Sequence, residues 1–207
     1  MFDVKRIPLG SNLANCYLVH DGKKALIIDP GAEAEKIKAK ISKLELEPIA
    51  ILLTHCHFDH IGALDSIREE YDLSVYQSPE EKDWPSDPEK NLSSLMDQAF
   101  SVREADYFFN PDEELEIGNF NFRVLATPGH SPGGVSFVFD EEDFVLSGDA
   151  LFAGSVGRTD LPGSEPNKLL PSIKKQLFTL PGHYKVYSGH GFPTTIQEEI
   201  DYNPFFQ

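Results

Sequence analysis

Three histidines and one aspartate lie within six consecutive residues of the segment THCHFDH, which spans residues 54–60. The segment directly follows IAILL, an apolar run typical of a buried strand. Residues two positions apart in an extended backbone point to the same side, so His55 and His57 can bind one metal ion while Cys56 points elsewhere. Asp59 and His60 come after the chain turns, where they can face a second ion. The types and spacing of these side chains therefore predict metal chemistry.

Three further apolar runs also end in a potential metal ligand. The segments FRVLATPGH, FVLSGD and YKVYSGHG place His130, Asp149 and His190 directly after strand-like sequences. A glycine precedes each of the three, which permits a sharp turn that sends the next side chain back over the edge of a sheet. Strands hold the backbone rigidly while the loops after them aim side chains, so segments distant in the sequence can build one site.

The donor types narrow the choice of metal. Imidazoles and carboxylates suit Zn, Fe and Mn, and the absence of cysteine from these strand ends argues against a closed structural zinc site. Seven ligands are too many for one tetrahedral ion, but suit two ions that share a bridging carboxylate and keep positions for water. His20 and His183 stand outside the pattern and are expected to be ordinary polar residues. We predict two divalent metal ions, with Zn foremost and Fe or Mn as alternatives.

The elements that position these residues are predicted from hydrophobic periodicity. Strands alternate with helical patterns in the first half of the chain, and the second half is mostly strands. The predicted strands cover residues 2–9, 13–20, 23–29, 49–53, 73–77, 119–127, 134–140, 143–149 and 184–190, and the predicted helices cover 33–47, 61–72 and 167–178. Residues 77–110 are expected to form a loop with a short helix. Two strand-rich halves with helices outside predict two sheets packed face to face.

Length and composition limit the possible partners and compartment. The 207 residues are enough for one substantial core, so a single domain over residues 1–207 is expected. A net charge of -16 opposes binding to nucleic-acid phosphates. Cys16 and Cys56 are too few for a disulfide framework and are expected to be reduced thiols. Neither a signal peptide nor an apolar run of about 18 residues is present, so we expect a cytoplasmic protein without a membrane partner, its oligomeric state left open.

The segments THCHFDH, ATPGHSPGG, LSGDALF and SGHG together resemble the metal motifs of the metallo-β-lactamase superfamily, in the same order and over nearly the whole chain. The resemblance implies the α/β class and a four-layer αββα sandwich, in which two mixed sheets carry helices on their outer faces. It also implies a ligand set: His55, His57 and His130 for the first ion, Asp59, His60 and His190 for the second, and Asp149 bridging both.

Within this superfamily, TPGHSPGG, GDALFAGSVGRTDLPG and GHGFPTT most resemble the short glyoxalase II-type hydrolases, which are hydroxyacylglutathione hydrolases. The resemblance implies hydrolysis of a small anionic acyl thioester, such as S-lactoylglutathione, by a metal-bridging hydroxide. Asp59 would orient that hydroxide as the catalytic residue. Long members of the group have a C-terminal helical domain that helps to hold glutathione, whereas only IQEEIDYNPFFQ follows the last motif here. Part of the thiol-carrier pocket is therefore expected to be missing.

Arg158 and Asp160 depart from the pattern of the long enzymes, which carry a lysine and a tyrosine that contact glutathione at these positions. Arg158 could bind a substrate carboxylate bidentately, whereas Asp160 would repel one. The alternative role of Arg158 is an ion pair with Asp160 that pins the loop. The sequence leaves both roles open, and Arg158 is the candidate substrate-binding residue.

Two other functions compete with thioester hydrolysis. Persulfide dioxygenases of the same superfamily share the THxHxDH pattern and a loop similar to GRTD; they bind one Fe(II) ion through two histidines and an aspartate and consume oxygen. A mononuclear Fe(II) dioxygenase is therefore the alternative function. A metal-binding scaffold without catalysis fits less well, because the full ligand set of an open site is present. Class B β-lactamases, which are secreted, and tRNA-processing nucleases, which carry a long exosite arm, also fit less well.

Overall fold

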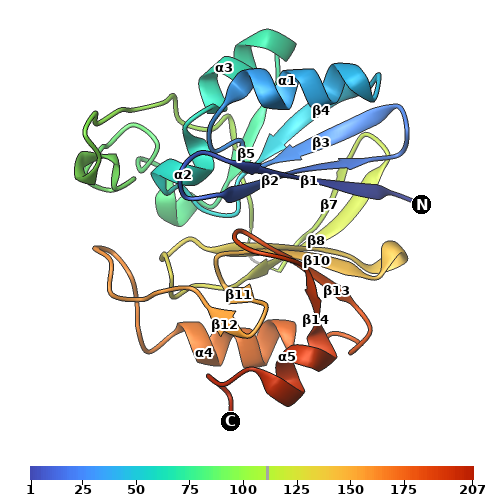
Figure 1. The fold of residues 1–207 in the computed structure, drawn as a ribbon, viewed down its shortest axis with the longest axis vertical. Helices are drawn as coiled ribbons and strands as arrows, with labels where there is room; N and C mark the ends of the chain where they lie inside the picture. The colour runs from blue at the N-terminus through green and yellow to red at the C-terminus, as the bar shows by residue number, and fades with distance from the viewer. Residues whose placement is uncertain (111) are drawn as a thin grey trace. The chain divides into compact units, whose positions relative to one another are not determined.

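The computed structural model describes residues 1–110 and 112–207, which form two compact units, Met1–Phe109 and Asn110–Gln207. Each unit is built around one six-stranded mixed sheet (Figure 1). Two mixed sheets with accompanying helices confirm the predicted α/β class. The single domain over residues 1–207 stays a prediction.

The sheet of the first unit has the strand order β1-β2-β3-β4-β5-β6. β1, β2 and β3 form an antiparallel meander, and β4, β5 and β6 are each parallel to the strand before them. β1, β3, β4 and β5 therefore run in one direction, and the segments that follow them emerge at one edge of the sheet. The strands are β1 (Asp3–Leu9), β2 (Ala14–His20), β3 (Lys24–Ile28), β4 (Glu47–Leu52), β5 (Val75–Gln77) and β6 (Tyr107–Phe108).

Two amphipathic helices cover one face of this sheet. α1 (Ala34–Lys43) buries Ile37 and Ile41, and α3 (Leu64–Tyr71) buries Leu64 and Ile67, all in one cluster with side chains of the sheet. The two helices lie side by side in Figure 1. They provide the crossovers that parallel strands require. Between β4 and α3 lies the four-residue helix α2 (Phe58–Ile61).

The predicted helix over residues 33–47 is four residues too long at its C-terminal end, because α1 ends at Lys43. Glu45 has a φ of +54°, a left-handed conformation that cannot continue a right-handed helix. The chain therefore turns, and β4 begins at Glu47, two residues before the predicted strand.

Residues 78–109, the last segment of the first unit, have little regular structure. They contain the 3₁₀ helices η1 (Pro79–Glu81) and η2 (Ser93–Leu95), in keeping with the predicted loop and short helix. Trp84 and Val102 are buried against the same apolar cluster as α1 and α3. The segment is thus anchored by side-chain packing rather than by a long helix.

The sheet of the second unit has the strand order β14-β13-β10-β9-β8-β7. β13 is parallel to β10, and the other neighbouring pairs are antiparallel. β8, β10 and β13 therefore run in one direction and end at one edge. The strands are β7 (Glu114–Ile117), β8 (Phe120–Ala126), β9 (Val135–Phe139), β10 (Phe144–Gly148), β13 (Lys185–Ser188) and β14 (Thr194–Thr195), with a separate hairpin of β11 (Leu151–Phe152) and β12 (Ser155–Val156).

Helices also cover one face of this second sheet, where α4 and α5 lie in Figure 1. α4 (Leu169–Ser172) continues directly into the π-helical turn η4 (Ile173–Leu177), so the predicted helix over residues 167–178 forms with an irregular interior that follows Pro171. α5 (Ile196–Tyr202) was not predicted. It contributes Ile196 to the apolar cluster of the second unit.

A 3₁₀ turn, η3 (Asp140–Glu142), connects β9 and β10. None of the helices among the described residues is both long and apolar enough to span a membrane.

Candidate metal centre

The THCHFDH segment lies at the sheet edge of the first unit because it follows β4. β3 is the parallel neighbour of β4, so Asp29, which follows β3, emerges beside Thr54 and His55. Asp29 accepts hydrogen bonds from the backbone amide of Thr54 at 2.8 Å and from the Thr54 hydroxyl at 2.6 Å. These two bonds join the loops after β3 and β4.

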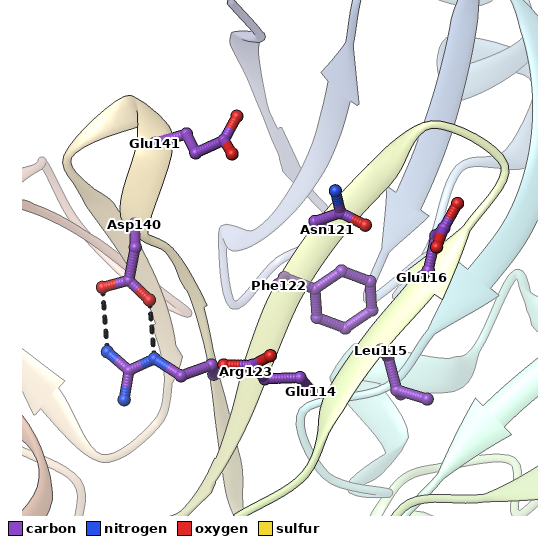
Figure 2. A pocket seen from close by; sticks show the side chains of 8 residues that line it. All are labelled: Glu114, Leu115, Glu116, Asn121, Phe122, Arg123, Asp140 and Glu141. Atoms are coloured by element: carbon purple, nitrogen blue, oxygen red, sulfur yellow. Dashed lines mark hydrogen bonds and ion pairs between the residues drawn. The ribbon is translucent and has the colours of Figure 1, made fainter.

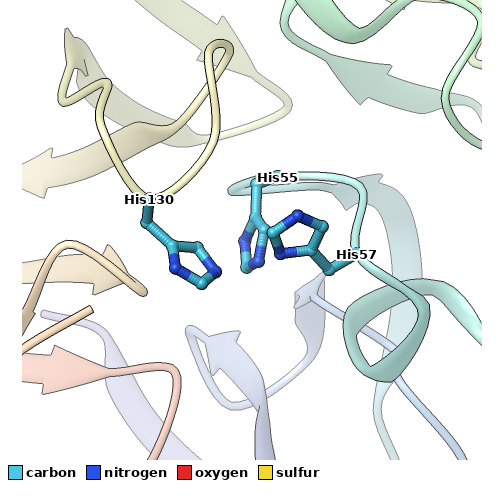
Figure 3. Close-up of side chains that lie close together, drawn as sticks. All are labelled: His55, His57 and His130. Carbon is cyan, nitrogen blue, oxygen red and sulfur yellow. The ribbon is translucent and has the colours of Figure 1, made fainter. Parts of the chain in front are cut away.

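His55 and His57 lie close together after β4. Their ring centroids are 4.7 Å apart in an edge-on arrangement, and Figure 3 shows the two rings turned toward each other. Both side chains are buried, and the His57 ring also lies 5.6 Å from the ring of Trp84. Cys56, between the two histidines, is buried in the apolar cluster of the first unit. The alternation of an extended chain thus separates the two imidazoles from the thiol.

The α2 turn brings His60 back toward His55. Their ring centroids are 4.2 Å apart, and His60 Nδ1 lies 3.0 Å from Asp29 Oδ2. One potential ligand atom from each of Asp29, His55 and His60 fits within a group no more than 4.8 Å across. A carboxylate on Nδ1 fixes the orientation of an imidazole and leaves Nε2 as its metal-binding nitrogen. Asp29 therefore suits an orienting role behind His60.

A glycine permits the close approach of the loop after β3 to α2. A Cβ atom on Gly31 would lie 1.7 Å from the backbone oxygen of Asp59, a distance that no side chain tolerates. Any other residue at position 31 would push α2 away from β3. The glycine thus fixes the position of Asp59, whose Oδ2 accepts a hydrogen bond from the Asn12 side chain at 3.3 Å.

Glu81 also holds the backbone of the THCHFDH segment in place. Its buried carboxylate accepts a hydrogen bond from the backbone amide of Cys56 at 2.7 Å. Burial raises the pKa of the Cys56 thiol well above its usual range, and the Glu81 carboxylate raises it further. Burial likewise raises the pKa of Cys16. Both cysteines are free and buried, so they are packing residues rather than nucleophiles.

The second unit brings three of the predicted ligands together at its own sheet edge. His130 (Figure 3) follows β8, Asp149 follows β10, and His190 follows β13. Asp149 Oδ2 lies 3.5 Å from His130 Nε2 and 3.4 Å from His190 Nε2. The common direction of the three strands accounts for this meeting of residues up to 60 positions apart in the numbering.

These distances fit shared metal ions. Two donors bound to one ion at about 2.1 Å with a tetrahedral angle between them lie about 3.4 Å apart. The Asp149 oxygen has this separation from both His130 and His190. His130 Nδ1 lies 2.8 Å from the backbone oxygen of Arg158, which can only accept, so Nδ1 carries the proton and Nε2 is the metal-binding nitrogen. The donor types and this geometry suit a transition metal or zinc.

The loop after β12 packs tightly against Asp149. A Cβ atom on Gly157 would lie 1.9 Å from the Asp149 backbone oxygen, so this position also requires glycine. Next to it, the exposed Arg158 guanidinium donates to both carboxylate oxygens of Asp160, at 2.6 and 2.8 Å. This bidentate pair is the loop-pinning arrangement that the sequence offered as one of two roles for Arg158.

The second unit also has a cavity of about 510 Å³, which lies along β7, β8 and η3 (Figure 2). Its wall is acidic, and its Arg123 donates to both carboxylate oxygens of Asp140, at 2.6 and 2.9 Å. None of the predicted metal ligands lines it. This cavity is therefore separate from the residues that predict metal chemistry.

Three residues that the sequence did not single out contact the metal motifs: Asn12, Asp29 and Glu81. Asp29 carried a readable signal, because it follows the apolar run ALII and precedes Pro-Gly, the same strand-end position that identified Asp149. Glu81 and Asn12 lie in irregular segments and carried no comparable signal.

Comparisons with known proteins agree with this arrangement. A family model described as the metallo-beta-lactamase superfamily matches residues 9–190. The probable metallo-hydrolase YqgX of Bacillus subtilis is 47% identical over 97% of this chain and 96% of its own length. The hydroxyacylglutathione hydrolase GloC of Haemophilus influenzae is 37% identical over 98% of this chain and 97% of its own length.

Two solved structures are similar along the whole chain. The BLEG-1 B3 metallo-beta-lactamase has a TM-score of 0.95 and 44% identity, covering 99% of this chain and 100% of its own. TTHA1623 in a di-iron-bound form has a TM-score of 0.86 and 42% identity, covering 97% of this chain and 99% of its own. These matches confirm the predicted fold and the metal-dependent hydrolase class. The chain belongs to the metallo-β-lactamase superfamily.

Proposed function

We propose that this protein is a binuclear metal-dependent hydrolase of small acyl thioesters, of the glyoxalase II type. The observation that carries the proposal is the match to a hydroxyacylglutathione hydrolase over 98% of this chain and 97% of the relative. The free, buried cysteines are compatible with a reducing cytoplasmic setting.

The proposed ligand set is the one that the motif resemblance implies, and the geometry within each unit supports it. His55, His57 and His130 would hold one ion, Asp59, His60 and His190 would hold the other, and Asp149 would serve both. The similar separations of His130 and His190 from one Asp149 oxygen, 3.5 and 3.4 Å, support the bridging role. The di-iron form of TTHA1623 supports two ions rather than one. Zn is the expected metal, with Fe or Mn as alternatives.

When bound, two divalent ions would supply a hydroxide nucleophile at neutral pH and would polarise the thioester carbonyl. Asp59 would accept a hydrogen bond from the nucleophile and orient it toward the carbonyl carbon, and the Asn12 side chain holds the Asp59 carboxylate in place. Asp29 keeps His60 in its metal-binding orientation. A thiolate leaves without help from a strong general acid, so the residues named above suffice for the reaction.

The substrate is expected to be anionic, although the protein has a net charge of -16. Local positive charge at a two-metal centre outweighs the distant surface charge for a group that reaches the ions. Arg158 could assist if its guanidinium exchanged Asp160 for a substrate carboxylate. We propose that the protein binds neither nucleic acid nor a membrane.

Hydrolysis of β-lactams is the second candidate function. It is favoured by the similarity to the BLEG-1 B3 metallo-beta-lactamase, at 44% identity and a TM-score of 0.95. Both reactions attack a carbonyl carbon and expel a heteroatom, so one centre of this kind can serve either. The leaving group separates them, because a lactam nitrogen needs a proton that a thiolate does not.

One set of measurements on protein purified without chelators tests these alternatives. Metal analysis should find about two ions per chain, and S-lactoylglutathione or a related thioester should be hydrolysed faster than a chromogenic cephalosporin. The reverse order of rates would favour the β-lactamase function. Oxygen consumption with glutathione persulfide, together with one bound iron and inert thioesters, would establish the dioxygenase alternative instead.

A further inference from the structure

A cavity of about 320 Å³ lies within the first unit at the same sheet edge as the THCHFDH segment. The turn between β1 and β2, the turn before α1, the start of α2 and the segment after η2 form its walls. Pockets for small molecules measure about 300–1,000 Å³, so this cavity has room for a small group rather than for a whole glutathione conjugate.

The wall of this cavity is apolar with two carboxylates. Its apolar side chains are Leu9, Ala32, Phe58, Met96 and Phe100. The carboxylates belong to Glu33 and Asp59, and none of the described residues that line the cavity is a lysine or an arginine. A carboxylate on a ligand would find no cationic side chain in this lining, whereas methyl and methylene groups would exchange water for apolar contacts.

Asp59 connects the cavity to the proposed centre. Its carboxylate lines the cavity and is held there by the Asn12 side chain at 3.3 Å. A substituent seated against Phe58 and Met96 would therefore leave the atom next to it within reach of the nucleophile that Asp59 orients.

We infer that the cavity binds the acyl substituent of the substrate, and that this substituent is a short, uncharged, apolar chain. The inference rests on the proposed thioester hydrolysis and specifies its substrate class. The thiol carrier, which bears the negative charges in glutathione, lies outside the cavity because the described lining offers its carboxylates no lysine or arginine. The acyl chain rather than the carrier then determines specificity at this position.

Binding of non-hydrolysable probes to the metal-loaded protein tests the cavity apart from catalysis. The probes are 2-oxoalkyl thioethers of N-acetylcysteamine, a neutral carrier, in which a methylene separates the carbonyl from sulfur so that hydrolysis is impossible. Calorimetry should show affinity rising about fourfold for each methylene added to the alkyl chain, until the cavity is full. Affinity independent of chain length would overturn the inference.

Met96 and its neighbour Leu95 offer a matched pair of variants. Met96 lines the cavity and is 41% exposed, whereas Leu95 is 67% exposed and lies outside the lining. Met96→Ala should flatten the dependence on chain length, and Met96→Leu, which conserves volume, should retain it. Leu95→Ala should behave like the wild type. An equal loss in Leu95→Ala and Met96→Ala would overturn the assignment of the cavity.

The same probes separate this inference from the proposed function. If the metal-loaded protein hydrolysed no thioester but still bound the probes with longer chains more tightly, thioester hydrolysis would be wrong and the apolar subsite would stand. If it hydrolysed thioesters at rates that did not depend on the acyl chain, and binding did not depend on it either, the subsite would be wrong and the hydrolase would stand.

Discussion

Asp29 Oδ2 lies 3.0 Å from His60 Nδ1, although 31 residues separate the two in the sequence. Both side chains are buried, and Asp29 also accepts two hydrogen bonds from Thr54. The carboxylate thus connects the loop after β3 to both ends of the THCHFDH segment. It orients one imidazole and fixes the backbone from which the others project.

Asp29→Asn should weaken metal binding by about 10- to 100-fold, because it removes the charge that orients His60 but keeps the shape of the side chain. Competition with a chromophoric chelator measures the change. Glu35→Gln removes one charge at an exposed position and is the matched control. Equal metal affinity in Asp29→Asn and the control would show that Asp29 only joins the two loops.

Asp59→Asn should lower kcat by at least about 100-fold while the fold remains intact, because it removes the charge that orients the nucleophile. Assays in excess metal, with circular dichroism of the same samples, measure both effects. Asn12→Ala removes one hydrogen bond to Asp59 and should have a smaller effect in the same direction. A near wild-type kcat with both metals bound to Asp59→Asn would exclude a catalytic role.

Arg158 and Asp160 should shift substrate affinity in opposite directions if the guanidinium binds substrate. Asp160→Asn releases Arg158 from its bidentate pair and should lower KM for a glutathione thioester. Arg158→Ala should raise KM on the order of tenfold through loss of a charge-assisted contact. Unchanged KM in both variants, with a lower Tm in Arg158→Ala, would leave the loop-pinning pair as the role of Arg158.

The two thiols should react with Ellman's reagent only after unfolding. Burial raises the pKa of Cys16 and of Cys56, so both remain protonated at neutral and mildly alkaline pH, and the thiolate is the reactive form. Native protein should release almost no chromophore at pH 8, and protein in denaturant should release two equivalents. Rapid reaction of the native protein would indicate that the cores around these cysteines open readily.

Removal of metal should lower Tm by about 5 to 10 °C, since a ligand present at about 100 times its Kd stabilises the native state by about 2.7 kcal/mol. Calorimetry before and after chelation measures the shift. Readdition of Zn should restore Tm, while Mg should not, because imidazole donors discriminate against it. Asp149→Asn should reduce the rise in Tm that Zn produces. An unchanged Tm after chelation would argue against a tightly bound metal.

Hydrophobic periodicity predicted the long elements because it is a local property. The pattern of β2 and β3, or of α1 with Ile37 and Ile41, is visible within a few residues. The two-residue strands β6, β11, β12 and β14, the four-residue strand β7 and the helices α2 and α5 escaped prediction, although the sequence ELEI of β7 does alternate polar and apolar residues. A strand of two residues has no period to read, and its pairing depends on which strand lies beside it.

The sequence by itself determined the ligand types, their positions after strands and the pairing of His55 with His57, because each depends on neighbours along the chain. Tertiary structure alone decided that Asp29 contacts His60, that Glu81 holds the Cys56 amide and that Asn12 reaches Asp59. The segments after β1, β3, β4 and β5 emerge at one edge of the sheet only because of the spatial order and direction of its strands. Strand order brings together residues far apart in the sequence, and no local spacing encodes it.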